Sequence, residues 1–150
     1  MLNPTVWLQP TPPPPPPPHP SEDRSVGGAR ATLRVLVVDD ERLIADTLSA
    51  ILDDSGFTAS AAYSGEEALE AARTLQPDVV ISDVLMPKMT GVELGIRLRQ
   101  ECPQSRVILF SGQAATSELL LKAQAEGHTF ELFPKPIHPE ELIAKLKARW

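Results

Sequence analysis

Residues 77–91 read PDVVISDVLMPKMTG, and this stretch decides the fold. Its β-branched run Val79–Ile81 predicts a short strand that is buried on both faces, as in the centre of a parallel sheet. Asp83 comes directly after the strand, and open α/β sheets bind their ligands at the carboxyl ends of their strands. The stretch therefore predicts a central strand with a candidate functional carboxylate. The plain alternative is an aspartate that only accepts backbone hydrogen bonds in the turn.

The segments on either side of this stretch alternate between strand and helix patterns. We expect strands over residues 33–38, 57–63, 79–81, 107–110 and 130–133, each followed by an amphipathic helix. Ser64 and Glu67 form a capping-box pattern at the start of one helix, and Pro139 lies in the first turn of the last. Five strands that alternate with five helices predict a parallel sheet covered by helices on both faces.

Residues 92–101 are the one ambiguous segment, because Val92, Leu94, Ile96 and Leu98 alternate as in a strand. A helix is the better prediction, since a strand here would interrupt the alternation of strands and helices. Gly95 in its middle is unfavourable by about 1 kcal/mol relative to alanine.

Composition narrows the function classes. The 150 residues contain 14 Lys and Arg against 20 Asp and Glu, a formal net charge of −6, which argues against non-specific binding to nucleic acid. No apolar run approaches the roughly 20 residues of a membrane span, and the N-terminus lacks a signal-peptide pattern. The single cysteine, Cys102, fits a reducing compartment. We expect a cytoplasmic protein without membrane insertion.

Residues 1–31 differ in composition from the rest of the chain. Seven consecutive prolines, at 12–18, favour extended polyproline II, and the segment has too few apolar residues for a core. We expect a disordered or stiff proline-rich tail at 1–31 and one folded domain at 32–150. The tail is either a ligand for a proline-binding domain or a passive extension. A third alternative is that translation truly starts further along the chain, near Val26, and that the tail is an artefact of a misplaced start.

The residues that end the predicted strands form a recognisable set: Asp39 and Asp40 after the first, Asp83 after the third, Ser111 after the fourth and Lys135 after the fifth. In a parallel sheet these strand ends share one edge, so the side chains should converge. Three carboxylates repel one another unless a cation neutralises them, and oxygen ligands favour Mg²⁺ over Zn²⁺. An aspartate beside Mg²⁺ and a lysine can attack phosphorus and keep the phosphoryl group.

Four motifs make the chain resemble the receiver domains of two-component response regulators: VLVVDDE at 35–41, ISDVLMPKMTGVEL at 81–94, VILFSG at 107–112 and FPKP at 133–136. The resemblance covers residues 33 to 150. It implies a flavodoxin-like doubly wound sheet with strand order 2-1-3-4-5, and a cis peptide at Lys135–Pro136.

The resemblance also implies a role for each site residue. Asp83 would be the phosphoacceptor, while Ser111 would contact the phosphoryl group and Lys135 would pair with it. Asp40, Asp83 and the backbone carbonyl of Leu85 would bind Mg²⁺, and Asp39 would lie mainly in the outer shell of the metal.

One position departs from the family pattern, and two others bear on how long the phosphoryl group would last. Leu132 stands where the family often has a tyrosine or phenylalanine that reports phosphorylation. Leu85 and Gln113 flank the path by which water would attack the phosphoryl group, and neither is a good base, which predicts slow dephosphorylation.

We therefore expect a single-domain response regulator, not an enzyme proper, which a histidine kinase phosphorylates and which then binds a downstream protein or phosphotransfer protein. A phosphorelay intermediate and a docking-only receiver are the alternatives. A haloacid-dehalogenase-type hydrolase is less favoured, because Leu85 occupies the place of its second acid. An FMN-binding flavodoxin would need a phosphate loop where this chain has Asp39, Asp40 and Glu41.

Overall fold

The computed structural model describes residues 13–14, 32–112 and 114–148. The chain divides between Ala31 and Thr32. The prediction of a disordered or stiff tail at residues 1–31 falls, apart from Pro13 and Pro14, outside the described residues. None of the described helices is both long and apolar enough to cross a membrane.

The folded part is a five-stranded parallel sheet with the order β2-β1-β3-β4-β5, as predicted. Its elements are β1 (Arg34–Val38), α2 (Arg42–Asp54), β2 (Thr58–Ala62), α3 (Gly65–Leu75), β3 (Val79–Asp83), α4 (Gly91–Glu101), β4 (Arg106–Ser111), α5 (Ala114–Ala125), β5 (Glu131–Pro134) and α6 (Pro139–Ala148). Each of the ten predicted elements is present, with boundaries shifted by one or two residues.

Two of these shifts concern strand ends and helix starts. Ser82 and Asp83 belong to β3, because they continue the register with Leu109 and Phe110 of β4. Helix α5 begins at Ala114, whereas the sequence pattern predicts a helix from about Thr116 to Glu126. The Lys135–Pro136 peptide is cis, as expected from the family resemblance.

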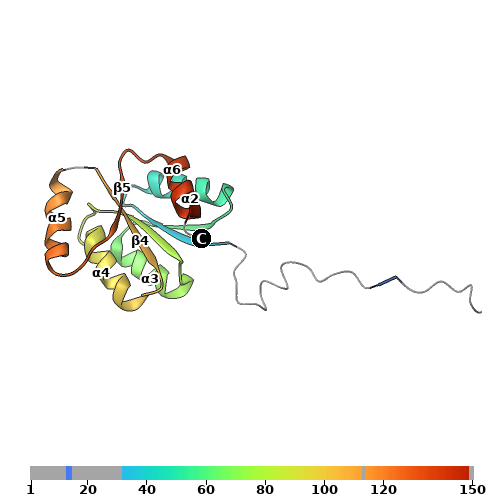
Figure 1. The fold of residues 1–150 in the computed structure, drawn as a ribbon, viewed down its shortest axis with the longest axis horizontal. Coiled ribbons are helices and arrows are strands. Elements are labelled where there is room, and N and C mark those ends of the chain that lie inside the picture. The colour runs from blue at the N-terminus through green and yellow to red at the C-terminus, as the bar shows by residue number, and fades with distance from the viewer. Residues whose placement is uncertain (1–12, 15–31, 113, 149–150) are drawn as a thin grey trace, which may run out of the picture. The chain divides into compact units, whose positions relative to one another are not determined.

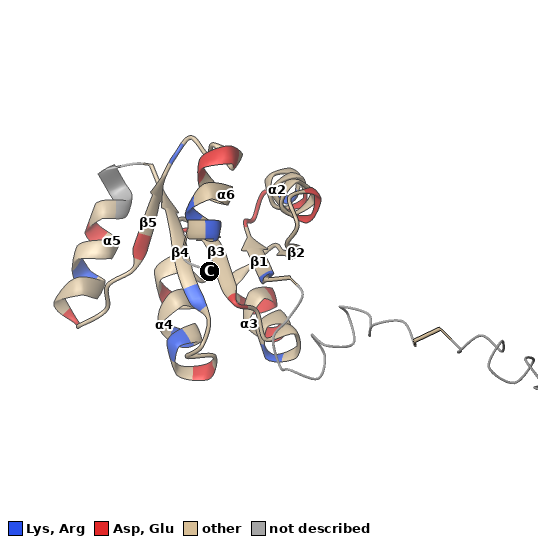
Figure 2. Cartoon of the chain, turned by 45° about the vertical axis from the view of Figure 1, so that its right-hand side comes forward, with Lys and Arg blue, Asp and Glu red and all other residues tan. Residues whose placement is uncertain are grey.

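Side chains on alternate strand positions build two hydrophobic layers, one on each face of the sheet. Helices α2 and α6 cover one face and α3, α4 and α5 cover the other, as Figures 1 and 2 show. The three central strands are buried on both faces, which explains why they are rich in valine, isoleucine and leucine. Packing on both faces thus fixes the positions of the strand ends relative to one another.

Helix α4 settles the ambiguous segment. Thr90 caps it by accepting a hydrogen bond from the amide of Glu93, and Leu94 and Leu98 are buried one turn apart. Gly95 is required by a neighbour: a Cβ atom there would lie 2.5 Å from the ring of Phe130. Glycine at position 95 makes the helix about 1 kcal/mol less stable than alanine would, but it lets the Phe130 ring pack directly on the helix backbone.

Candidate functional site

The first strand brings a buried carboxylate to the carboxyl edge of the sheet. Asp39 follows β1 and is only 4% exposed. Its amide donates to the carbonyl of Ala62 (3.1 Å), which continues the pairing with β2, and its Oδ1 accepts from the amide of Glu41 (2.9 Å). These two bonds hold Asp39 at the strand end and orient its side chain along the edge.

Three carboxylates meet at this edge. Asp39, Asp40 and Asp83 each bring one oxygen to within 4.8 Å of the other two. Burial raises the pKa of the Asp39 carboxyl, the nearby charges of Asp83 and Asp40 raise it further, and the Glu41 amide and Lys135 act in the opposite direction. An ionised Asp39 is therefore costly in this position unless a cation shares the site.

Lys135 is the predicted cationic partner, and the structure brings it to Asp83. Its Nζ lies 3.0 Å from Asp83 Oδ1, and the two side chains are 38% and 13% exposed. Gly112 allows this approach, since a Cβ atom there would lie 2.7 Å from Cβ of Lys135. The ion pair holds the Asp83 carboxylate at the site and compensates one of the three negative charges.

Ser111 is the last residue of β4 and comes to the same edge. It pairs with Pro134 in β5, and its carbonyl accepts from the amide of Lys135 (3.2 Å). All five side chains singled out in the sequence therefore lie at strand ends on one edge. Gln113, the further position considered for turnover, lies outside the described residues.

The loop after β3 is folded back on the strand end. The amide of Gly91 donates to the carbonyl of Val84 (2.8 Å), and the amide of Leu85 lies 3.4 Å from Asp83 Oδ1. Leu85 is 43% exposed. A metal-binding role for its carbonyl stays a prediction.

The residue chemistry fits a hard divalent cation. Three carboxylates and one ammonium sum to a formal charge of −2, and all the candidate ligands are oxygen atoms. Mg²⁺ takes one or two carboxylates and otherwise keeps water, and the exposed side of Asp40 leaves room for it. The residues present therefore fit Mg²⁺.

The position of the expected aromatic switch holds a leucine beside a small cavity. Leu132 is 45% exposed and lines a cavity of about 160 Å³ together with Leu120 of α5. Phe133 points to the other face and packs edge-on against Phe110, with ring centres 5.8 Å apart. Phe130 packs on Gly95 and also lines this cavity, on the same side of the sheet as Leu132.

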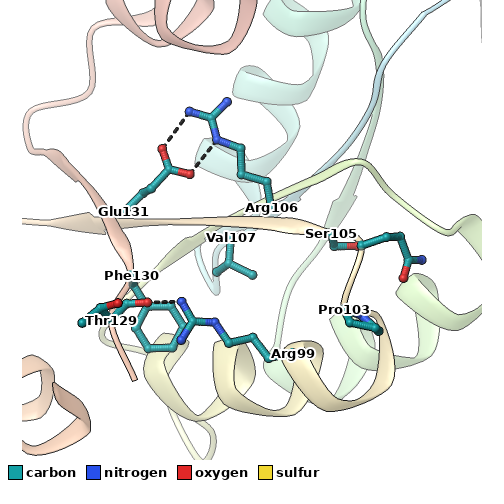
Figure 3. Close-up of a pocket in the computed structure, with 9 residues that line it drawn as sticks. Arg99, Pro103, Ser105, Arg106, Val107, Thr129, Phe130 and Glu131 are labelled. Atoms are coloured by element: carbon teal, nitrogen blue, oxygen red, sulfur yellow. Dashed lines mark hydrogen bonds and ion pairs between the residues drawn. The ribbon is translucent and has the colours of Figure 1, made fainter. Parts of the chain in front are cut away.

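Sequence reasoning missed the opposite edge of the sheet, where the strands begin. A pocket of about 580 Å³ lies there, and Arg106 and Glu131 are among its lining residues (Figure 3). Arg106 Nε and Nη2 donate to the two carboxylate oxygens of Glu131 at 2.6 and 2.7 Å. Arg99 stacks on the ring of Phe130, 4.1 Å from its centre, and donates to the carbonyl of Thr129. Opposite charges that begin two neighbouring strands, Arg106 and Glu131, were the available signal.

Comparisons with known proteins agree with this geometry. Residues 35–147 match the family profile described as the response regulator receiver domain. Among curated proteins, the chain is 32% identical over 117 residues to "Response regulator MprA" of Mycobacterium ulcerans and 36% identical over 114 residues to "Probable transcriptional regulatory protein TcrX" of Mycobacterium tuberculosis. These matches cover 78% and 76% of this chain but 50% and 48% of those proteins. The chain thus spans about half the length of the curated relatives it matches.

Solved structures give the same result for the fold. The chemotaxis protein CheY4 of Vibrio cholerae superposes with a TM-score of 0.68 at 32% identity, over 79% of this chain and 98% of that one. A CheY-like receiver domain protein of Methanospirillum hungatei JF-1 superposes with the same TM-score at 25% identity, over 79% of this chain and 93% of that one.

Proposed function

Since the chain belongs to the response regulator receiver domain family of two-component systems, we propose that Asp83 accepts a phosphoryl group from the phosphohistidine of a histidine kinase. The observation that carries this proposal is the site itself: three carboxylates within 4.8 Å of one another, with Lys135 3.0 Å from Asp83. An acceptor carboxylate beside a cation site and a lysine is suited to phosphoryl transfer, which depends mainly on positioning and charge.

In the transfer, an Asp83 carboxylate oxygen forms a bond to phosphorus while the bond between phosphorus and the donor imidazole nitrogen breaks. The donor nitrogen keeps the electron pair of the broken bond, and because the other ring nitrogen of the phosphohistidine is protonated, the ring leaves as neutral imidazole. Lys135 would pair with the transferred phosphoryl oxygens, and Ser111 would donate its hydroxyl to one of them. Both groups stand at strand ends, so little rearrangement of the main chain is needed.

We assign Mg²⁺ to the acid cluster, with Asp40, Asp83 and the carbonyl of Leu85 as its protein ligands and Asp39 in the outer shell. When bound, Mg²⁺ neutralises charge on the transferred oxygens. Asp39 supports this set by keeping its own carboxylate oriented through the Glu41 amide, at 2.9 Å.

The phosphorylated site would alter the face formed by α5, β5 and α6, which then binds a downstream protein or a phosphotransfer protein. Exposed apolar side chains also follow two of the site residues in the chain: Leu43 and Ile44 of α2 come shortly after Asp40 and border a pocket with Ile137, which comes shortly after Lys135. They support a protein rather than a metabolite as the phosphodonor. We propose a cytoplasmic switch that is not itself an enzyme.

The similarity to CheY4, of which 98% is covered, supports a receiver that acts as a single domain. A phosphorelay intermediate would use the same site and pass the group on. A docking-only receiver is less favoured, because Asp39, Asp40, Asp83 and Lys135 are all brought together.

The test is to incubate the purified protein with a small-molecule phosphodonor, with and without Mg²⁺, and to measure its intact mass. We expect the mass of one phosphoryl group to be added only when Mg²⁺ is present. A protein that stays unmodified with Mg²⁺, while a known receiver is modified in parallel, would refute phosphoacceptor function.

A further inference from the structure

The last two residues of β3 make a contact that the proposed chemistry does not yet use. Ser82 is fully buried, and its Oγ donates to the carbonyl oxygen of Asp83 at 2.9 Å. It lies on an otherwise apolar side of the sheet, in register with Leu109 of β4 and following Val80 on the same face. A buried hydroxyl among apolar residues is unfavourable unless it is hydrogen-bonded. Its near partner is the main chain of Asp83, while the Met86 sulfur, at 4.0 Å, is a second and weaker acceptor.

This bond fixes one peptide group from both ends. The peptide between Asp83 and Val84 has its carbonyl bound by Ser82 Oγ, and its amide donates to the carbonyl of Phe110 in β4 at 3.3 Å. At the end of β3, the Ser82 hydroxyl thus supplies a hydrogen bond to the Asp83 carbonyl in addition to those between the strands.

The next peptide depends on the first. The carbonyl of Val84 accepts from the amide of Gly91 at 2.8 Å, and the amide of Leu85 faces Asp83 Oδ1 at 3.4 Å. Two consecutive peptide planes thus lie between the Ser82 contact and the Leu85 carbonyl, and each is held. A rotation of the first plane would move both the Asp83 side chain and the Leu85 carbonyl.

Gly91, the first residue of α4, lies close to the same carbonyl oxygen. A Cβ atom at this position would lie 2.1 Å from the carbonyl oxygen of Asp83. That oxygen therefore lies close to both the Ser82 hydroxyl and the start of α4, with little room to turn.

We propose that Ser82 is a positioning residue, which orients the Asp83 carboxylate and the Leu85 carbonyl toward the cation and so sets Mg²⁺ affinity. This inference rests on the proposed function. It assigns to Ser82 no contact with the phosphoryl group.

The experiment compares Ser82→Ala with Ser105→Ala. Ser105 is a matched control, because it is also buried and donates to a backbone carbonyl, that of Pro77, at 2.6 Å, but at the opposite edge of the sheet. Mg²⁺ affinity is measured by calorimetry, and hydrogen exchange of the Val84 amide by NMR in the metal-free protein. Both variants should lose thermal stability to a similar degree, since each loses one buried hydrogen bond.

We expect Mg²⁺ to bind Ser82→Ala about fivefold more weakly, with faster exchange at Val84, and to bind Ser105→Ala as it binds the wild type. Ser82→Cys, which keeps the size and a weak donor, should lie between Ser82→Ala and the wild type; it also serves as the test if Ser82→Ala does not fold.

Unchanged Mg²⁺ affinity in Ser82→Ala, or in Ser82→Cys if only that variant folds, would overturn the inference, as would an equal loss in Ser105→Ala. A wild type that binds no Mg²⁺ and takes up no phosphoryl group would instead overturn the proposed function.

Discussion

The two edges of the sheet are built from the same five strands but differ in how their charges are balanced. At the amino edge, Arg106 and Glu131 neutralise each other through two short hydrogen bonds, and the Arg106 side chain is only 9% exposed. At the carboxyl edge, the carboxylates of Asp39, Asp40 and Asp83 share one ammonium group. The Arg106–Glu131 pair is neutral as it stands, whereas the carboxylate cluster with Lys135 keeps a formal charge of −2 until a cation binds.

This difference separates stability from function within one fold. A paired charge at a strand end tightens the sheet, because it removes the cost of leaving a buried charge without a partner. An uncompensated cluster lowers stability and supplies binding free energy for a cation or a phosphoryl group. Changes at the amino edge should therefore affect unfolding, and changes at the carboxyl edge should affect ligand and phosphoryl binding.

The largest expected effect is complete loss of phosphorylation in Asp83→Asn. The amide keeps the shape of the side chain but cannot act as the nucleophile, so the fold should stay intact while no phosphoryl mass is gained. Intact mass after incubation with donor and Mg²⁺ measures this, and Asp54→Asn, at the end of α2, is the control that should behave as wild type. Phosphoryl uptake by Asp83→Asn would show that another residue is the acceptor.

At the amino edge, Glu131→Ala should lower the free energy of unfolding by about 2 kcal/mol, because it leaves the buried Arg106 guanidinium without its partner. Mg²⁺ affinity should not change. Denaturant unfolding and calorimetry measure the two quantities. Glu101→Ala is a matched control, because its ion pair with Arg73 is more exposed, at 34% and 54%, and should contribute less than about 1 kcal/mol. Equal losses in the two variants would contradict the contrast between the edges.

Asp40→Ala should weaken Mg²⁺ binding about tenfold or more, because it removes a direct carboxylate ligand. In the absence of Mg²⁺ the same variant should be at least as stable as wild type, since Asp39 and Asp83 lose a repelling neighbour. Calorimetric titration and thermal unfolding without metal test these two expectations. The assignment fails if wild type and variant bind Mg²⁺ equally well.

Leu85→Asn should speed loss of the phosphoryl group several-fold, or about 1 kcal/mol in the activation barrier. The leucine is apolar and exposed beside Asp83, so it cannot orient an attacking water, whereas asparagine can. The rate is followed after removal of the donor. The prediction is wrong if wild type loses its phosphoryl group within seconds or if the variant is slower.

The smallest effect should follow removal of the proline-rich tail. Both edges lie within residues 32–148, so a chain that begins at Ala31 should take up the phosphoryl group at the wild-type rate and unfold at the same temperature. A marked loss of either would show that the tail contributes to the folded domain.

Much of the carboxyl edge was predictable because a change in residue type marks the end of each strand. Val79–Ile81 is apolar and β-branched and Asp83 follows it, so residue type and position together indicate both the strand and its terminal carboxylate. In a parallel sheet the carboxyl ends of all strands lie at one edge, so residues predicted to end different strands are predicted to lie near one another. The convergence of Asp39, Asp40, Asp83, Ser111 and Lys135 follows from topology alone.

The contacts between distant segments could not be predicted in the same way. In the sequence, Gly95 only weakens a helix, and no pattern within α4 indicates that the ring of Phe130 packs on it. Likewise, Ser82 is an ordinary polar residue in the sequence, and its role depends on which way its hydroxyl turns. Patterns in sequence report local periodicity, whereas these features arise from packing.

The approach of Gly91 to Asp83 also limits how the sequence can diverge. Every other amino acid carries a Cβ atom, which would lie 2.1 Å from the Asp83 carbonyl oxygen, so even alanine must displace the backbone of Asp83. By contrast, a Cβ atom at Gly56 would meet nothing within 4 Å, so a substitution there costs only the local backbone strain that its φ of +101° imposes on a side chain, and no other atom has to move. In a library of single substitutions selected for signalling, position 91 should admit glycine alone, while position 56 should accept a second residue.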